Sequence, residues 1–150
     1  MAKQFIFPLE KVLDYKKNIE DLKAEELNNS RGKKKKEEEK LKSIEKKKQD
    51  VLLGDCSREN MTLNQLNIST DYLHQINDQI EKGEERILDA DTEVENKLEH
   101  LIEASKDKKV VEKLRERKLN EHKILEKRSE RKQADEIANR NNMNKRENKS

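Results

Sequence analysis

Residues 66–104 read LNISTDYLHQINDQIEKGEERILDADTEVENKLEHLIEA, and this stretch decides the fold. Apolar side chains recur there at a strict interval of seven residues, at Leu66, Leu73, Ile80, Ile87, Val94 and Leu101. Ile76, Ala90 and Ala104 stand three residues after members of this series. A straight α-helix has about 3.6 residues per turn, so a sevenfold series keeps facing one side only if the helix supercoils left-handedly around another helix. The stretch predicts one long helix of a coiled coil, with the leucine and isoleucine series in its core.

A partner helix is predicted on the N-terminal side of this stretch. Pro8 suits a first helical turn, where the missing backbone N–H has no partner to lose. Apolar residues then follow at helical spacing, at Leu9, Val12, Leu13, Ile19 and Leu22, and again at Leu41, Ile44, Val51 and Leu52. We therefore expect helix one over residues 8–53.

A turn is predicted over residues 54–60, where the apolar pattern stops. Gly54 is expected to take the left-handed conformation that ends many helices. Asn60 or Thr62 is expected to cap the next helix, because a side-chain oxygen there can accept a hydrogen bond from a free backbone N–H. Helix two is then expected over residues 61–140.

Helix two is predicted to be much the longer helix, at about 120 Å against about 65 to 70 Å for helix one. Its C-terminal third should extend beyond helix one, and residues 141–150 have the composition of a frayed end. Asn, Ser and Gly at residues 28–32 leave open whether helix one kinks there or runs through. The expected fold class is all-α: a long two-helix antiparallel coiled-coil hairpin forming one domain over residues 1–150.

The composition fits a thin helical rod and excludes several other classes. The chain has 45% charged and 30% hydrophobic residues, three Gly and one Pro, which argues against sandwiches, barrels and α/β folds. The net charge of only +2 does not indicate a nucleic-acid binder. A single cysteine, Cys56, suits the reducing cytosol. The short apolar run Phe5-Ile6-Phe7 is far below the length of a membrane span, so no direct membrane insertion is expected.

No residue pattern in the sequence predicts catalysis. His74, His100 and His122 lie far apart and lack the i,i+4 spacing of a helical metal site, so we expect them to face solvent. No phosphate-binding loop, nucleophile motif or carboxylate pair can be drawn, and a two-helix rod has no cleft that excludes water. We expect a non-enzymatic protein with no metal and no cofactor.

Two features are candidates for partner contact. The run Lys33 to Lys36 is followed by three glutamates, so a solvated face is a better reading than a lipid or RNA site. Tyr72 precedes the core residue Leu73 and lies on the flank of the stripe beside Ile76, in a chain with few aromatics. It is as well explained by packing over the edge of the stripe as by contact with a partner.

Three segments in order along the chain resemble the FliJ family of bacterial flagellar type III export proteins. Residues 5–15, FIFPLEKVLDY, are similar to the family's start of aromatic-x-aromatic, Leu and Val-Leu. Residues 101–114, LIEASKDKKVVEKL, resemble its Trp-x-x-Ala, basic, Glu-Lys-Leu stretch, with Leu101 in place of the usual Trp. Residues 128–140, RSERKQADEIANR, resemble its closing signature, with Arg131 in place of the usual Gln.

This resemblance implies a fold and a set of partners. The family's members are two-helix antiparallel coiled coils similar to the central stalk of rotary ATPases. The resemblance implies binding to the hexameric flagellar export ATPase, to the cytoplasmic domain of the membrane export gate and to export chaperones. It also implies a cytoplasmic protein held at the inner face of the cell membrane through the export apparatus, in the service of flagellum biogenesis and motility.

Site residues follow from the same resemblance. The family's gate-contacting flank falls on Tyr72 and Ile76. We place the ATPase contacts at the start of helix one and the start of the extension of helix two, at Phe5, Phe7, Leu9, Lys109, Glu112, Leu114 and Arg117.

Two other classes of function remain open from the sequence. One is a structural tether or homodimerising zipper, in which helix two pairs with its own copy. The hairpin predicts a monomer in free solution, whereas the zipper predicts a dimer that depends on concentration. The other is a basic nucleic-acid-binding arm, whose affinity would fall steeply with salt; the hairpin predicts no nucleic-acid partner.

Overall fold

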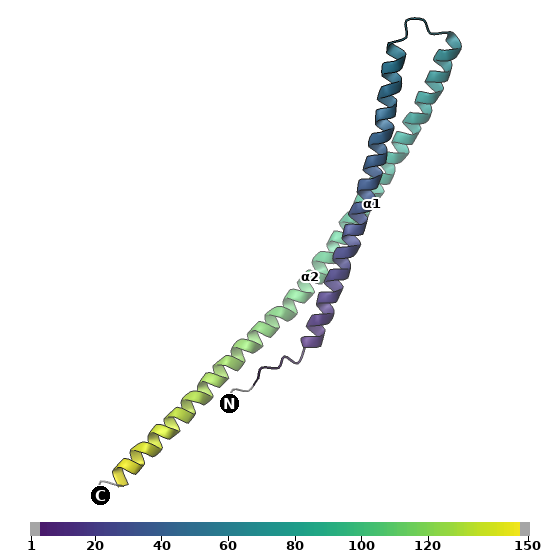
Figure 1. The fold of residues 1–150 in the computed structure, drawn as a ribbon. Helices are drawn as coiled ribbons and strands as arrows, with labels where there is room; N and C mark the ends of the chain where they lie inside the picture. Colours follow the sequence, from purple (N-terminus) through teal and green to yellow (C-terminus); the bar gives the residue numbers. More distant parts are fainter. Residues whose placement is uncertain (1–3, 148–150) are drawn as a thin grey trace. The chain divides into compact units, whose positions relative to one another are not determined.

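The computed structural model describes residues 4–147 and consists of two long helices joined by a turn (Figure 1). Helix α1 spans Glu10–Cys56 and helix α2 spans Leu63–Glu147, with 47 and 85 residues. The described residues contain no β-strand. The predicted all-α hairpin, with helix two longer than helix one, is confirmed.

Contacts within the chain divide it into two compact units. In the described chain, unit 1 combines residues 4–19 with residues 105–147, and unit 2 consists of residues 20–104. In unit 1 the N-terminal segment and the start of α1 lie along α2, and in unit 2 the rest of α1 and the first half of α2 form a hairpin closed by the turn. That the whole chain behaves as one domain stays a prediction.

The turn occupies residues 57–62, and it is closed by side chains at both helix ends. Thr62 and Gln65 form a capping box: the Gln65 N–H donates to Thr62 Oγ1 at 3.3 Å, and the Thr62 N–H donates to Gln65 Oε1 at 3.1 Å. At the end of α1, the Ser57 hydroxyl donates to the carbonyl of Gly54 at 2.9 Å. Of the two predicted caps, the structure selects Thr62.

The predicted left-handed Gly54 is wrong. Gly54 lies inside the last turn of α1, and no described glycine has a positive φ. Its carbonyl, one of the four left without a helical partner, is satisfied by the Ser57 hydroxyl, so the chain ends the helix without a left-handed residue. As a result α1 continues to Cys56, and the turn starts three residues later than predicted.

The other helix boundaries also differ from the sequence reading. Helix α1 begins at Glu10 and runs without a break through residues 28–32. Ser30 is buried there and its hydroxyl donates to Glu93 at 3.3 Å, so it does not compete for the backbone of its own helix. Helix α2 continues to Glu147, past the predicted end at residue 140, and basic residues in its last turn complement the helix dipole. Residues 148–150 of the predicted frayed tail lie outside the described residues.

Unit 2 is held by a heptad seam, by which we mean the positions where the two helices face each other. On α2 the seam positions are Ser69, Leu73, Ile76, Ile80, Gly83, Ile87, Ala90, Val94, Lys97, Leu101 and Ala104. On α1 they include Leu27, Ser30, Lys34, Glu37, Leu41, Ile44, Lys48, Val51 and Asp55. Alternate steps of three and four residues on both helices are the spacing of knobs-into-holes packing. The sevenfold series read from the sequence is therefore the seam, with one exception.

The exception is Leu66, which was predicted to be core and is 49% exposed. It keeps the sevenfold register with Leu73, but α1 has already ended at Cys56, so no helix covers it. A hydrophobic pattern on one helix cannot tell where the partner helix stops.

Three seam positions on α2 have no apolar side chain: Ser69, Gly83 and Lys97. The Ser69 hydroxyl donates to Asp55 at the end of α1. A Cβ on Gly83 would lie 3.1 Å from the Cδ1 atom of Leu41, so the glycine makes room for that leucine. The Lys97 ammonium donates to Glu26 at 3.1 Å. This bond, with a second from Lys23, holds the pKa of Glu26 below its ordinary value of 4.5.

Candidate partner-binding surfaces

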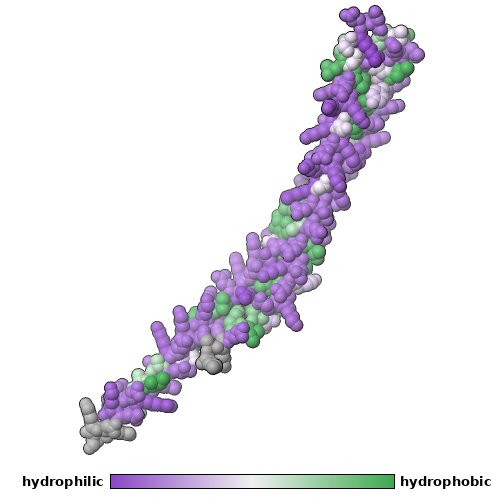
Figure 2. Space-filling model, viewed as in Figure 1, coloured by the Kyte–Doolittle hydropathy of each residue, from purple (hydrophilic) through white to green (hydrophobic). Residues whose placement is uncertain are grey.

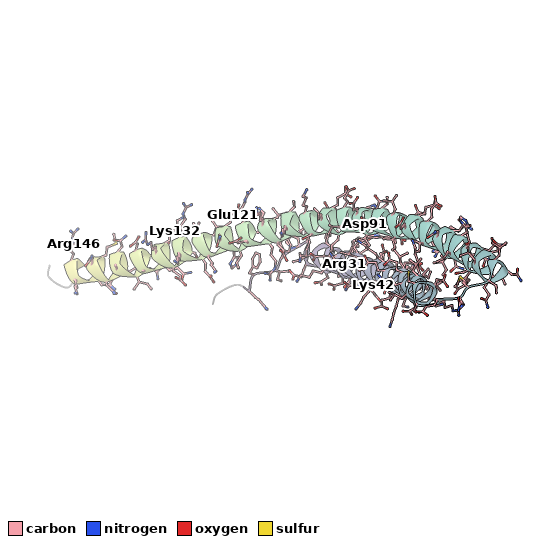
Figure 3. The ribbon with its side chains drawn as sticks, turned by 90° about the horizontal axis from the view of Figure 1, so that it is seen from above. Arg31, Lys42, Asp91, Glu121, Lys132 and Arg146 are labelled. Carbon is pink, nitrogen blue, oxygen red and sulfur yellow. The ribbon has the colours of Figure 1, made fainter. Side chains whose placement is uncertain are left out.

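The middle of the unit 2 seam is polar on the α1 side. Between Leu27 and Leu41 the α1 seam positions are Ser30, Lys34 and Glu37. Three cross-helix contacts replace apolar packing: Ser30 to Glu93 at 3.3 Å, Lys34 to Asp91 at 2.6 Å, and Arg86 to Glu37 at 3.1 Å. In Figure 3 Asp91 lies on α2 and Arg31 on the facing helix α1. Partly exposed pairs of this kind add little stability, and they fix which residues face each other.

Hydrogen bonds in this polar segment shift the pKa values of Lys34 and Glu37. The hydrogen bond to Asp91 raises the pKa of Lys34 above its ordinary value of 10.5. The bonds from Lys40 and then Arg86 hold the pKa of Glu37 below its ordinary value of 4.5. Both groups therefore favour their charged forms in the hairpin, and their stabilising effect depends on pH.

Exposed apolar side chains gather at the turn end of unit 2, as Figure 2 shows. We call Leu53, Leu63, Leu66, Ile68 and Tyr72 together the hairpin-end surface; it is not a single face, because Leu66 and Ile68, two residues apart on α2, point to opposite sides of that helix. Leu53, Leu63 and Ile68 are 70%, 75% and 63% exposed. Residues 60–70 contain no charged residue in a chain that is 45% charged. The sequence reading missed this surface, although the absence of charge was visible there.

The two residues predicted to contact the gate have different environments. Tyr72 is 45% exposed and belongs to the hairpin-end surface, whereas Ile76 is 3% exposed and lies in the seam. A direct contact to a partner at Ile76 would require the two helices to separate. The structure therefore supports only Tyr72 as an accessible contact.

In unit 1, the segment before α1 packs against α2. The Phe5 ring meets the His122 ring edge to face, with centroids 5.6 Å apart, and Phe7 is buried. His122 is half-buried by this contact rather than solvent-facing as expected, whereas His74 and His100 are exposed. Phe5 and Phe7 thus serve first to hold the N-terminal segment on α2.

The remaining predicted ATPase-contact residues lie around the start of α1. Glu10 accepts a hydrogen bond from Arg115 at 3.0 Å, which brings the start of α1 beside the α2 segment of Glu112, Leu114 and Arg117. Leu9 and Leu114 are partly exposed, and Lys109 and Arg117 are exposed. Glu112 lines a shallow groove together with Glu10, Leu13, Lys17, Arg115, Glu116 and Leu119. Whether these residues touch a partner stays a prediction.

Beyond His122, α2 continues within unit 1 as a helix whose side chains are almost all exposed, with Glu126 half-buried. Ile124, Leu125, Ile137 and Met143 are exposed among many charged residues. Figure 3 shows Lys132 on this part of α2. It is the predicted extension of the longer helix.

Among residues 4–147, no three His, Cys, Asp or Glu side chains lie together as a possible metal site. Over the same residues, neither helix has an apolar stretch long enough to cross a membrane.

The fold and its surfaces define a coiled-coil protein of the helical-hairpin class. The pattern of the family described as Flagellar FliJ protein matches residues 5–147. The chain belongs to this family, and it is therefore a component of flagellar protein export and flagellum biogenesis. Neither the curated proteins nor the solved structures give a match. The family is one of export components and not an enzyme family.

Proposed function

We propose that the chain is a non-enzymatic adaptor of the flagellar export apparatus, working in the cytoplasm at the inner face of the cell membrane. In this role it binds the hexameric export ATPase, the cytoplasmic domain of the export gate and export chaperones. The observation that carries the proposal is the family match over residues 5–147. The hairpin supports it, because among its described residues no cluster of reactive side chains is buried.

ATPase binding is proposed for unit 1. Leu9 and Leu114 expose apolar surface near the point where Arg115 meets Glu10, and Lys109 and Arg117 add positive charge. An apolar centre with a charged rim is the usual anatomy of a protein interface. Phe5 and Phe7 support this surface by anchoring the N-terminal segment, and Glu112 contributes to the groove beside it.

The free chain is proposed to be a monomer. In unit 2 the seam residues of α2 from Leu73 to Ala104 are already paired with α1, so a second copy has no uncovered stripe to bind there. This arrangement favours the hairpin over a homodimerising zipper. Sedimentation over a range of concentrations should give a constant mass near 17.8 kDa.

The ATPase experiment compares wild type with Leu114→Asp and with Leu88→Asp, the control being an exposed leucine of unit 2 outside the proposed interface. We expect wild type and Leu88→Asp to bind the export ATPase and to raise its hydrolysis or assembly. Leu114→Asp should bind at least about tenfold more weakly, because a charge replaces the apolar centre of the interface. A wild-type protein that neither binds the ATPase nor changes its activity would overturn the proposal.

A further inference from the structure

Three exposed apolar side chains lie in one line along α2 in unit 2. Between residues 77 and 104, the apolar residues of α2 are all seam residues except Leu88, Leu98 and Ile102. These three are 67%, 38% and 44% exposed. Each of them follows a seam position by one residue. Residues displaced from the seam by the same single step lie on the same flank of the helix, so the three side chains point to one side.

Acidic residues complete this line. Six residues of α2 are connected by alternate steps of four and three, and each follows a seam position by one: Glu84, Leu88, Asp91, Glu95, Leu98 and Ile102. Such steps keep to one face of a coiled-coil helix. We call these six residues the acidic stripe, which covers about 27 Å of α2.

The opposite flank of α2 has no apolar side chain between residues 79 and 103. The residues there are Gln79, Lys82, Arg86, Asp89, Glu93, Asn96, His100 and Glu103. Single exposed leucines are normal on protein surfaces and need no explanation. Here all three exposed apolar residues of this part of α2 share one flank, which is the arrangement expected of a contact surface.

The acidic stripe carries negative charge that the hairpin neutralises only in part. Residues 78–103 contain ten acidic and three basic residues. Asp91 accepts a hydrogen bond from Lys34 of α1 at 2.6 Å. Within residues 4–147, neither Glu84 nor Glu95 accepts a hydrogen bond from a basic side chain. These two carboxylates therefore remain available to a partner's cations.

The neighbouring flank of α1 does not supply the missing positive charge. The Glu38 carboxylate lies 4.0 Å from the Lys34 ammonium, so this lysine is shared between carboxylates of both helices. The charged α1 residues that follow seam positions by one are of both signs: Arg31, Lys35, Glu38, Lys42 and Glu45. The surplus of negative charge on this side of the hairpin therefore belongs to α2.

Apolar and acidic residues in one line are complementary to a basic amphipathic helix. Apolar side chains of such a helix would cover Leu88, Leu98 and Ile102, while its Lys or Arg side chains would reach the carboxylates between them. Steps of four and three residues match the period of a helix, whereas side chains of an extended strand alternate with a period of two. The same carboxylates repel an acidic protein or a nucleic acid.

We propose that the acidic stripe is a docking site for a basic amphipathic helix of a partner protein, which packs along α2 as a third helix. The contact needs no opening of the hairpin, because the seam residues stay covered by α1. The stripe lies in unit 2, whereas ATPase binding is proposed for unit 1, so the two assignments are tested separately.

The experiment measures binding of a synthetic peptide to the full chain by calorimetry at about 0.05 M NaCl. The peptide has about 18 residues, the length of helix that covers the stripe, with Leu on one face and Lys on the other. A second peptide carries Glu in place of Lys. We expect the Lys peptide to bind at least about tenfold more tightly than the Glu peptide.

The apolar part of the contact is tested by a double variant that leaves the charge unchanged. Leu88→Ser with Ile102→Ser should weaken binding of the Lys peptide at least about tenfold, because both removed side chains are apolar anchors. The matched control is Leu53→Ser with Leu63→Ser, two leucines exposed by 70% and 75% outside the stripe. The control should bind within about twofold of wild type. Circular dichroism checks that all variants stay helical.

The acidic part of the contact is tested by a second pair of double variants with the same change of charge. Glu84→Gln with Glu95→Gln should weaken binding of the Lys peptide at least about threefold. Asp89→Asn with Glu103→Gln removes two carboxylates from the opposite flank and should bind within about twofold of wild type.

The proposal is overturned if the Lys peptide does not bind wild type, or if each stripe variant binds it as tightly as its control does. It is also overturned if the free chain forms a dimer that Leu88→Ser with Ile102→Ser abolishes, since the stripe would then bind a second copy. Selective loss in the stripe variants, with both controls unchanged, supports the docking site whether or not the export ATPase binds.

Discussion

Replacing Ile76 by alanine distinguishes a residue that holds the hairpin together from one that contacts a partner. Ile76 is 3% exposed in the unit 2 seam. Truncating a buried isoleucine to alanine costs about 2–5 kcal/mol, depending on how well the site can collapse. A seam between only two helices has solvent on both sides and can relax, so we expect the lower part of this range, about 2–3 kcal/mol.

The assay is urea and thermal unfolding followed by circular dichroism. A loss of this size should lower the melting temperature by about 5–10 °C for a chain of this length. Ile68→Ala is the matched control, because Ile68 is 63% exposed on the same helix, and it should change stability by less than about 0.5 kcal/mol. An Ile76→Ala variant that unfolds like wild type, yet binds the gate domain more weakly, would refute the assignment of Ile76 to the seam.

Two further predictions concern Gly54 and the polar seam. Gly54 is helical, and nothing lies within 4 Å of a Cβ added there. Gly54→Ala should therefore raise the free energy of unfolding in urea by about 0.5–1 kcal/mol. A variant less stable than wild type would instead indicate that Gly54 adopts the left-handed conformation. Because the pKa values of Glu26 and Glu37 are lowered in the folded state, their stabilisation is present above pH 4.5 and is lost as the pH falls through the folded values. The raised pKa of Lys34 gives a contribution present below pH 10.5 and lost as the pH rises through its folded value. The urea concentration at the unfolding midpoint should therefore be highest near neutral pH and decrease toward both acidic and alkaline pH. In Glu37→Gln the decrease toward acidic pH should be smaller than in wild type. An equal decrease in that variant would contradict this account.

The fold was predictable because most seam positions of the second helix are apolar residues. Leu73, Ile80, Ile87, Val94 and Leu101 repeat every seven residues, and no other regular structure keeps such a series on one side. The antiparallel arrangement followed from the interruption of the apolar pattern at residues 54–60, between two helical stretches.

The α1 side of the seam could not be read in the same way. Ser30, Lys34 and Glu37 occupy seam positions, but a hydrophobic pattern counts them as surface. Their role depends on Glu93, Asp91 and Arg86 on the other helix, and that pairing exists only once the register is known. Hydrophobic periodicity does not detect seam positions that are filled by polar residues.

The candidate surfaces were predicted only in part, for a related reason. Tyr72 and Ile76 are one helical turn apart, and the heptad pattern placed Ile76 in the stripe with Tyr72 on its flank. It was the family resemblance that assigned both residues to a partner. Leu66 was misplaced because its exposure is set by the end of α1 at Cys56. Gly54 was misassigned because the Ser57 hydroxyl supplies the helix end with a donor.

The most direct test of the fold is an intramolecular cross-link between seam partners. Lys34→Cys and Asp91→Cys, in a Cys56→Ser background, would be treated with a short bis-maleimide at low protein concentration. The hairpin predicts a cross-linked product of monomer mass, whereas Lys34→Cys with Thr70→Cys, displaced by about 30 Å along α2, should give none. A product of twice the monomer mass, or equal reaction of the two pairs, would contradict a chain that folds back on itself in this register.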